Sequence, residues 1–167
     1  MADRYWIASS AGNWNDTDNW STTSGGSSGA AVPTSSDDVY FDGNGTGDCT
    51  LDVNATMLSL TMADAYTGTF DSADYDLTIA DDIDIGTGVT WTKGTGTITL
   101  APSADVTVNF EGESIENVEI DASGAIVEWT GTAVMGDLTV TAGTMDAGEQ
   151  DLECMDLTLA VGARITE

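Results

Sequence analysis

Pairs of apolar residues separated by one position recur about every twenty residues along the chain. Successive pairs begin 19, 19, 21, 20, 20 and 19 residues apart. Apolar residues at alternate positions predict short strands with one inward side, and no window carries the spacing of a helical stripe. The pairs are Val39 and Phe41, Leu58 and Leu60, Leu77 and Ile79, Ile98 and Leu100, Val118 and Ile120, Leu138 and Val140, and Leu157 and Leu159.

A second apolar set follows these pairs, at Leu51 and Val53, Phe70, Val89 and Trp91, Val108 and Phe110, Ile126, Met145 and Ile165. Two or three short strands in a repeat of about 20 residues suit one turn of a parallel coil. We therefore expect an all-β fold, a parallel β-solenoid (β-helix) of about seven turns over residues 37–167. A β-sandwich or jelly roll is the alternative, because it also produces closely spaced short strands.

The shared phase of the repeat predicts ladders of inward side chains, because a slip of one residue would turn a whole strand over. The thirteen residues expected to point inward are Val39, Leu58, Leu60, Leu77, Ile79, Ile98, Leu100, Val118, Ile120, Leu138, Val140, Leu157 and Leu159.

Residues 1–36 break the pattern and contain three of the five tryptophans, Trp6, Trp14 and Trp20. The first turn of a solenoid exposes backbone and apolar side chains, so natural solenoids cover it with an atypical segment. We expect residues 1–36 to form such a cap within one compact domain. The alternative is an aromatic platform that binds sugar.

The same segment resembles the opening module of repetitive β-rich proteins of tailed bacteriophages and of bacterial surface proteins. The resemblance covers about 40 residues and implies a structural role on the exterior of a virus particle, without a catalytic residue. It is carried by Arg4-Tyr5-Trp6, Gly12-Asn13-Trp14, Asn19-Trp20-Ser21, Ser24-Gly25-Gly26, Gly29-Ala30, Val32-Pro33-Thr34 and Asp37-Asp38-Val39-Tyr40-Phe41.

Charge and composition limit the partners and the reactions that we expect for this chain. Twenty-nine acidic residues against three basic ones give a formal net charge of −26, which repels nucleic acid and anionic membrane surfaces. The chain has no histidine, and so it lacks the commonest general base and the commonest zinc ligand. We therefore expect no enzyme activity and no bound cofactor other than calcium.

Calcium is a candidate ligand at Asp42, Asn44, Thr46 and Asp48, where oxygen-bearing side chains alternate as they do in a calcium loop. Val53 stands where such a loop would carry its bidentate Glu. A turn stabilised by its own Asp and Asn side chains is the alternative.

Carboxylates are the remaining candidates for chemistry. Asp82 and Asp84 fall on one side of a predicted strand, directly after Asp81. Such a pair could hydrolyse a glycosidic bond or hold calcium. A solvated outer face is the favoured explanation, because so acidic a chain places carboxylates at this spacing by chance.

The apolar pattern continues at Leu157, Leu159, Val161 and Ile165, close to Arg164. A last turn with unpaired backbone groups is a template for further strand pairing. We expect these five residues to form an interface, either with a second copy in a homo-oligomer or with another virion protein.

Two functions follow from these observations. The first is a structural protein of a bacteriophage virion, a capsid decoration (cement) protein or short fibre module that contacts proteins such as the major capsid protein. Residues 1–6 lack the features of a signal peptide, so we expect assembly in the host cytoplasm and a place on the virion surface. The alternative is a carbohydrate-binding or carbohydrate-degrading β-helix protein, such as a spike or bacterial adhesin.

Mutual repulsion among the carboxylates predicts that the protein is more stable at pH 5 than at pH 8 in low salt, because mild acid or added salt relieves the repulsion. Melting temperatures measured across this pH range test the prediction. A steady fall in melting temperature from pH 8 to pH 5 would show that paired or metal-bound carboxylates dominate instead.

Overall fold

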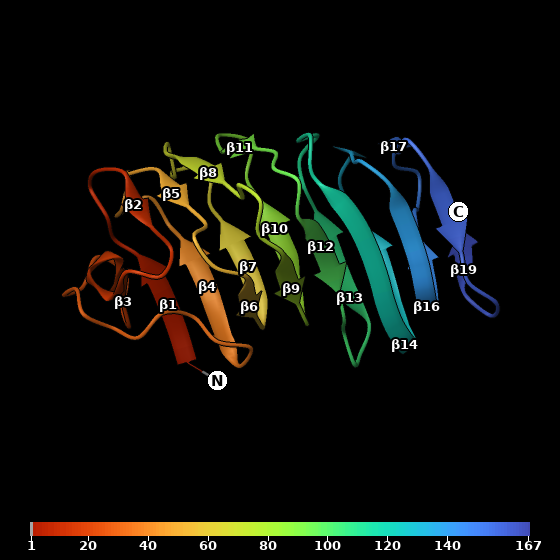
Figure 1. Ribbon diagram of the computed structural model, residues 1–167, viewed down its shortest axis with the longest axis horizontal. Helices are drawn as coiled ribbons and strands as arrows, with labels where there is room; N and C mark the ends of the chain where they lie inside the picture. Colours follow the sequence, from red (N-terminus) through yellow and green to blue (C-terminus); the bar gives the residue numbers. More distant parts are fainter. Residues whose placement is uncertain (1) are drawn as a thin grey trace.

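The structure, a computed structural model that describes residues 2–167, is a parallel β-solenoid with about six turns (Figure 1). Successive turns lie side by side from the N-terminal end to the C-terminal end of the long axis (Figure 1). The predicted fold class is confirmed, with about six turns in place of about seven. Helix is limited to one 3₁₀ turn, η1 (Thr17–Asn19), and no helix among residues 2–167 has the length and hydropathy to cross a membrane.

The strands of the turns form three faces of the coil. The first face contains β1 (Ala2–Trp6), β4 (Asp37–Phe41), β7 (Ser59–Met62), β10 (Ile83–Ile85), β13 (Val106–Asn109) and β19 (Arg164–Thr166). The second face contains β6 (Ala55–Met57), β9 (Leu77–Ile79), β12 (Thr97–Leu100) and β18 (Leu157–Leu159). Two long strands, β14 (Asn117–Trp129) and β16 (Leu138–Asp146), bend around the corner between these faces and belong to both.

The third face is interrupted. Its first part is a parallel sheet of β2 (Gly12–Asn13), β5 (Cys49–Thr50), β8 (Thr69–Asp71) and β11 (Thr90–Thr92). Its second part is the pair β15 (Ala133–Val134) and β17 (Leu152–Glu153). Between them, residues 111–116 form only an isolated bridge from Ser114 to Val134.

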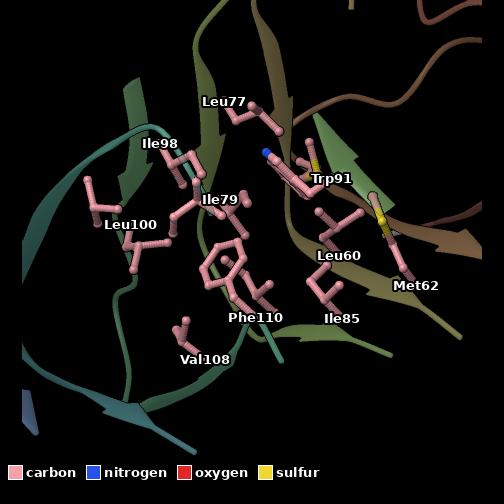
Figure 2. Close-up of a cluster of buried hydrophobic side chains, with 14 of the residues drawn as sticks. Leu60, Met62, Leu77, Ile79, Ile85, Trp91, Ile98, Leu100, Val108 and Phe110 are labelled. Atoms are coloured by element: carbon pink, nitrogen blue, oxygen red, sulfur yellow. The ribbon is translucent and has the colours of Figure 1, made fainter. Parts of the chain in front are cut away.

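Inward side chains of equivalent strands stack directly above one another. On the second face, the register places Leu100 between Ile79 and Ile120, and Val140 follows Ile120. All four side chains are buried. Figure 2 shows Ile79 and Leu100 of this column beside inward residues of the other faces. Parallel sheets need cover on their inner side, and here each sheet covers the others.

An aromatic stack continues through the core from the cap to the end of β14. Its ring centroids are 5.7 Å apart from Trp6 to Phe41, 5.8 Å from Phe41 to Phe70, and 4.6 Å from Phe70 to Trp91. It continues to Phe110 at 5.9 Å and then to Trp129 at 5.8 Å. Rings at such separations attract one another beyond the gain from burial.

Ten of the thirteen side chains predicted to point inward are buried, and three are not. Leu58 is partly exposed at the corner between β6 and β7. The spacing in the sequence predicts that Leu58 and Leu60 occupy the same face as Leu77 and Ile79. In the structure Leu60 pairs with Val39 on the first face, whereas Leu77 and Ile79 lie on the second. Two faces share the same alternation, so pairs from different faces fall at similar spacing.

Leu157 and Leu159 are 55% and 49% exposed, contrary to the prediction that they are buried. They extend the columns of Leu138 and Val140, with which they pair. No further turn among residues 2–167 lies below them. Their exposure therefore reflects the end of the coil rather than a change of register.

Glycines form the corner between the second and first faces in the last three turns. Gly124, Gly143 and Gly162 adopt φ values of +83°, +85° and +93°. A Cβ on Gly143 would lie 2.1 Å from the carbonyl oxygen of Ala122 in the turn above. Only glycine tolerates both this backbone conformation and this close approach.

Leu100→Asp tests the register of the core. The substitution buries an unpaired charge, so we expect a loss on the order of 4 kcal/mol in the free energy of unfolding. Thr99→Asp changes the neighbouring outward residue of β12 and serves as the matched control, with little loss expected. Urea denaturation measures both. A Leu100→Asp protein as stable as the control would contradict the register.

Candidate functional site

The three cap tryptophans are buried, with exposed fractions of 0%, 1% and 0% for Trp6, Trp14 and Trp20. The indole nitrogen of Trp6 donates to the carbonyl of Gly47 at 2.9 Å, and that of Trp20 donates to the carbonyl of Trp14 at 2.7 Å. The rings pack edge to face, with centroids 4.8 Å apart for Trp14 and Trp20. These rings close the first end of the core and present no surface on which a sugar could stack.

The first 36 residues also include the start of the coil. Strand β1 pairs in parallel with β4, and its last residues pair in antiparallel fashion with β3 (Trp20–Ser21). Arg4 fastens the loop that follows: its Nε donates to the carbonyl of Ala31 at 2.9 Å. Its guanidinium also forms an ion pair with Asp37 at 3.7 Å. The predicted cap thus consists of a partial first turn and the loop that covers it.

Asp37 anchors the end of this loop. Burial acts to raise its pKa, but hydrogen bonds from the backbone and side chain of Thr34 and the charge of Arg4 outweigh this effect. The net result is a pKa below the usual value. A carboxyl whose pKa is lower in the folded state than in the unfolded state stabilises the fold at any pH above its unfolded pKa. This contribution is lost as the pH falls through the pKa of the folded state. The contribution of Asp37 to stability is therefore retained at a pH where a carboxyl with an ordinary pKa would begin to take up a proton.

The predicted calcium residues lie in the loop between β4 and β5. The backbone of Asn44 donates to Asp42 at 3.0 Å, and its side chain donates to Ser24 at 2.8 Å. Asp48 instead accepts a hydrogen bond from the backbone of Thr69, in the next turn, at 2.8 Å. Thr46 is exposed. The loop therefore shows the turn chemistry of the alternative explanation, and calcium binding stays a prediction.

Asp42 is stabilised in its ionised form. Burial acts to raise its pKa, but hydrogen bonds from Ser24 and Asn44 lower it below the usual value.

Across residues 2–167, no group of three His, Cys, Asp or Glu side chains is arranged to hold a metal ion.

The three candidate catalytic carboxylates lie at the beginning of β10. Asp81 accepts from the backbone of Asp82 at 3.0 Å. Asp82 accepts from the backbone of Thr107 in the next turn at 2.7 Å, and Asp84 from the side chain of Asn109 at 3.2 Å. Both residues therefore link successive turns along the outer surface.

A shallow groove of about 400 Å³ runs across this surface. Its acidic lining residues are Asp82, Asp105, Glu128 and Asp146, and none of its lining side chains is basic. Asp82 thus belongs to a negatively charged outer face of the coil, which the carboxylate spacing in the sequence had suggested.

A buried carboxylate lies where the third face is interrupted, and the sequence pattern did not identify it. Glu116 is 1% exposed and contacts the side chain of Ser72. It accepts from the backbone of Gly94 at 2.7 Å and from the indole nitrogen of Trp91 at 3.2 Å. Glu113 accepts from the backbone of Trp91 at 3.3 Å. Glu113 thus satisfies a backbone donor of β11, and Glu116 satisfies the backbone donor of Gly94 just after it, where no strand follows.

The end of the coil opposite the cap is open. Strands β18 and β19 pair with β16 and with no other strand among residues 2–167. The predicted interface residues come together here and are all exposed: Leu157, Leu159, Val161, Arg164 and Ile165. We call the surface formed by these residues the open end.

Two residues of the open end, Leu157 and Ile165, line a cavity of about 640 Å³. Its apolar walls include Leu138, Met145, Leu152, Leu157 and Ile165. Such an exposed apolar surface on a sheet edge is typical of a protein interaction site.

The two cysteines are free and differ in environment. Cys49 is buried in the core, where burial raises the pKa of its thiol well above the usual value. Cys154 is exposed and lines the cavity of the open end.

Glu116→Ala tests whether the buried carboxylate holds the edge of β11. The change leaves the indole nitrogen of Trp91 without a partner and leaves Gly94 with only its hydrogen bond to Ser72, so we expect a loss on the order of 3 kcal/mol in the free energy of unfolding. Glu116→Gln keeps one acceptor and should lose less. Glu119→Ala, on the outer side of β14, is the matched control. Urea denaturation that shows equal losses at both positions would refute this role.

Comparisons with known proteins assign no family to this chain. No protein-family model matches it, and no curated protein or solved structure matches it. Its function must therefore be inferred from the chemistry of its own surfaces, of which the open end is the most distinctive.

Proposed function

We propose that this chain is a structural protein of a bacteriophage virion, a capsid decoration protein or short fibre module on the particle exterior. The open end would attach it to another particle protein, such as the major capsid protein. The observation that carries the proposal is the polarity of the coil, which has a sealed aromatic cap at one end and an unpaired apolar edge at the other.

A solenoid with one adhesive end suits attachment. Its stacked turns form a continuous core, so a load applied at one end is transmitted through backbone hydrogen bonds to the other. The outer faces carry polar side chains, including the inter-turn contacts of Asp82 and Asp84. Such polar faces remain in contact with water and do not favour association with other proteins. The resemblance of the N-terminal 40 residues to phage structural modules supports the same function.

The outer charge also fits a virion exterior. With a formal charge of −26, the outer faces of the coil repel nucleic acid and also repel the outer faces of other copies. Crowded copies on a capsid would remain separate, and contact would concentrate at the end that carries exposed apolar side chains.

The alternative is a carbohydrate-acting protein, and the acidic groove lined by Asp82, Asp105, Glu128 and Asp146 favours it. Paired carboxylates perform glycoside hydrolysis when one acts as an acid and the other as a nucleophile or base. A panel of polysaccharides incubated with the purified protein tests this alternative. Turnover that disappears in Asp82→Asn would replace the structural proposal.

Mass spectrometry of purified particles tests the structural proposal. We expect peptides of this chain in particles purified from the cells that encode it, in a constant ratio to the major capsid protein. Host cytoplasmic proteins of similar abundance provide the control for contamination. If the chain is abundant in the lysate but absent from the particles, the proposal is wrong.

Immunogold labelling then locates the chain on intact particles. Antibody raised against residues of the outer faces should label the exterior without disruption of the particle. Labelling that requires disrupted particles would contradict an exterior location.

A further inference from the structure

The open end has an unpaired backbone edge in the register of the coil. Leu157 pairs with Leu138, and Leu159 pairs with Val140, so β18 continues the columns of the second face. Ile165 continues the first face below Met145. An extended segment added in parallel beneath β18 would find both free backbone groups and two half-covered leucines.

The cavity indicates what the inward side chains of such a segment must be. Its walls are apolar at Leu138, Met145, Leu152, Leu157 and Ile165. Leu157 and Leu159 remain about half exposed, at 55% and 49%. Alternating aliphatic side chains would fill this space as the next rung of each column.

The rim of the open end indicates the charge of the segment. Three carboxylates line its cavity, and no basic side chain does. Complementary charge steers association and suppresses wrong partners. The rim carboxylates are Glu149, Asp151 and Glu167.

This charge argues against a second copy of the chain. Two open ends brought together would oppose six rim carboxylates to two guanidinium groups, because each end contributes three carboxylates and the guanidinium of Arg164. Residues 1–167 do not supply a matching segment either, because they contain only three basic residues. The complementary strand must therefore lie outside these residues.

We infer that the open end takes an extended strand of another protein, which alternates aliphatic residues with lysine or arginine and adds to β18 as a further turn. The inference rests on the proposed function in one respect, because a virion protein would supply the strand. It replaces the expected homo-oligomer with a partner of defined chemistry.

Three amidated peptides test the inference on the purified chain. The first alternates the two kinds of residue, as Lys-Leu-Lys-Val-Lys-Leu-Lys. The second carries Glu in place of each Lys, and the third has the first peptide's composition with its three aliphatic residues adjacent. We expect the first peptide to bind, with affinity about tenfold or more above both controls and weakened by added salt.

Two site-specific readouts accompany the titration. Amide hydrogen exchange at Leu157 and Leu159 should slow about tenfold with the first peptide, because their backbone groups become paired. Alkylation of the exposed Cys154 should slow as well, and the buried Cys49 serves as an internal control for intact folding.

Variants locate the binding surface. The double variant Leu157→Thr/Leu159→Thr should reduce the affinity about tenfold, since it removes exposed apolar area. Val134→Thr changes an apolar side chain of similar exposure, 43%, on the third face and should have no effect. If the double variant fails to fold, the three peptides on the unaltered chain still decide the matter.

Several results would overturn the inference. Equal binding of the lysine and glutamate peptides would remove the charge argument, and failure of all three to bind would remove the docking strand. Light scattering that shows a dimer at micromolar concentration, with β18 already protected from exchange, would identify a second copy as the occupant. Absence of the chain from particles would reject the proposed function and leave a positive peptide result intact.

Discussion

Parallel backbone hydrogen bonds between equivalent residues of successive turns hold each inward side chain against its counterpart in the next turn. Ile79, Leu100, Ile120 and Val140 illustrate the arrangement, since their pairing and their burial come from the same register. A turn alone has no core, because its strands are too short to cover their own apolar side. Each turn is therefore stable only where a neighbour supports it, and this dependence gives particular importance to the interruption of the third face and to both ends.

The interruption shows how the coil replaces a missing strand. Strand β11 has a neighbour on one side only, and the carboxylates of Glu113 and Glu116 accept hydrogen bonds that a following strand would otherwise accept. A buried carboxylate is tolerated when donors surround it, as Ser72, Trp91 and Gly94 surround Glu116. The acidic composition thus serves the interior as well as the surface.

At each end of the coil the core has no further turn to cover it, and the two ends differ in what lies over it. At the first end, Trp6, Trp14 and Trp20 cover the core, and the Arg4–Asp37 ion pair secures the loop above them. At the other end, the described residues leave β18 and β19 unpaired on one side. Uncovered apolar edges are a hazard for association unless charge limits what can approach. The rim of carboxylates supplies that restriction and connects the geometry of the fold to the proposed attachment.

The sequence alone determined the fold class, the approximate repeat and most inward positions, because a parallel solenoid repeats one apolar alternation at nearly constant spacing. It also located the open end, since Leu157 and Leu159 continue that alternation. Three features needed the tertiary structure. The assignment of Leu58 and Leu60 to faces depends on corners, which alternation does not encode. The role of Glu116 depends on Trp91 and Gly94, donors more than twenty positions earlier in the chain. The exposure of Leu157 and Leu159 depends on what lies beneath them, and a local pattern cannot distinguish a covered strand from an uncovered one.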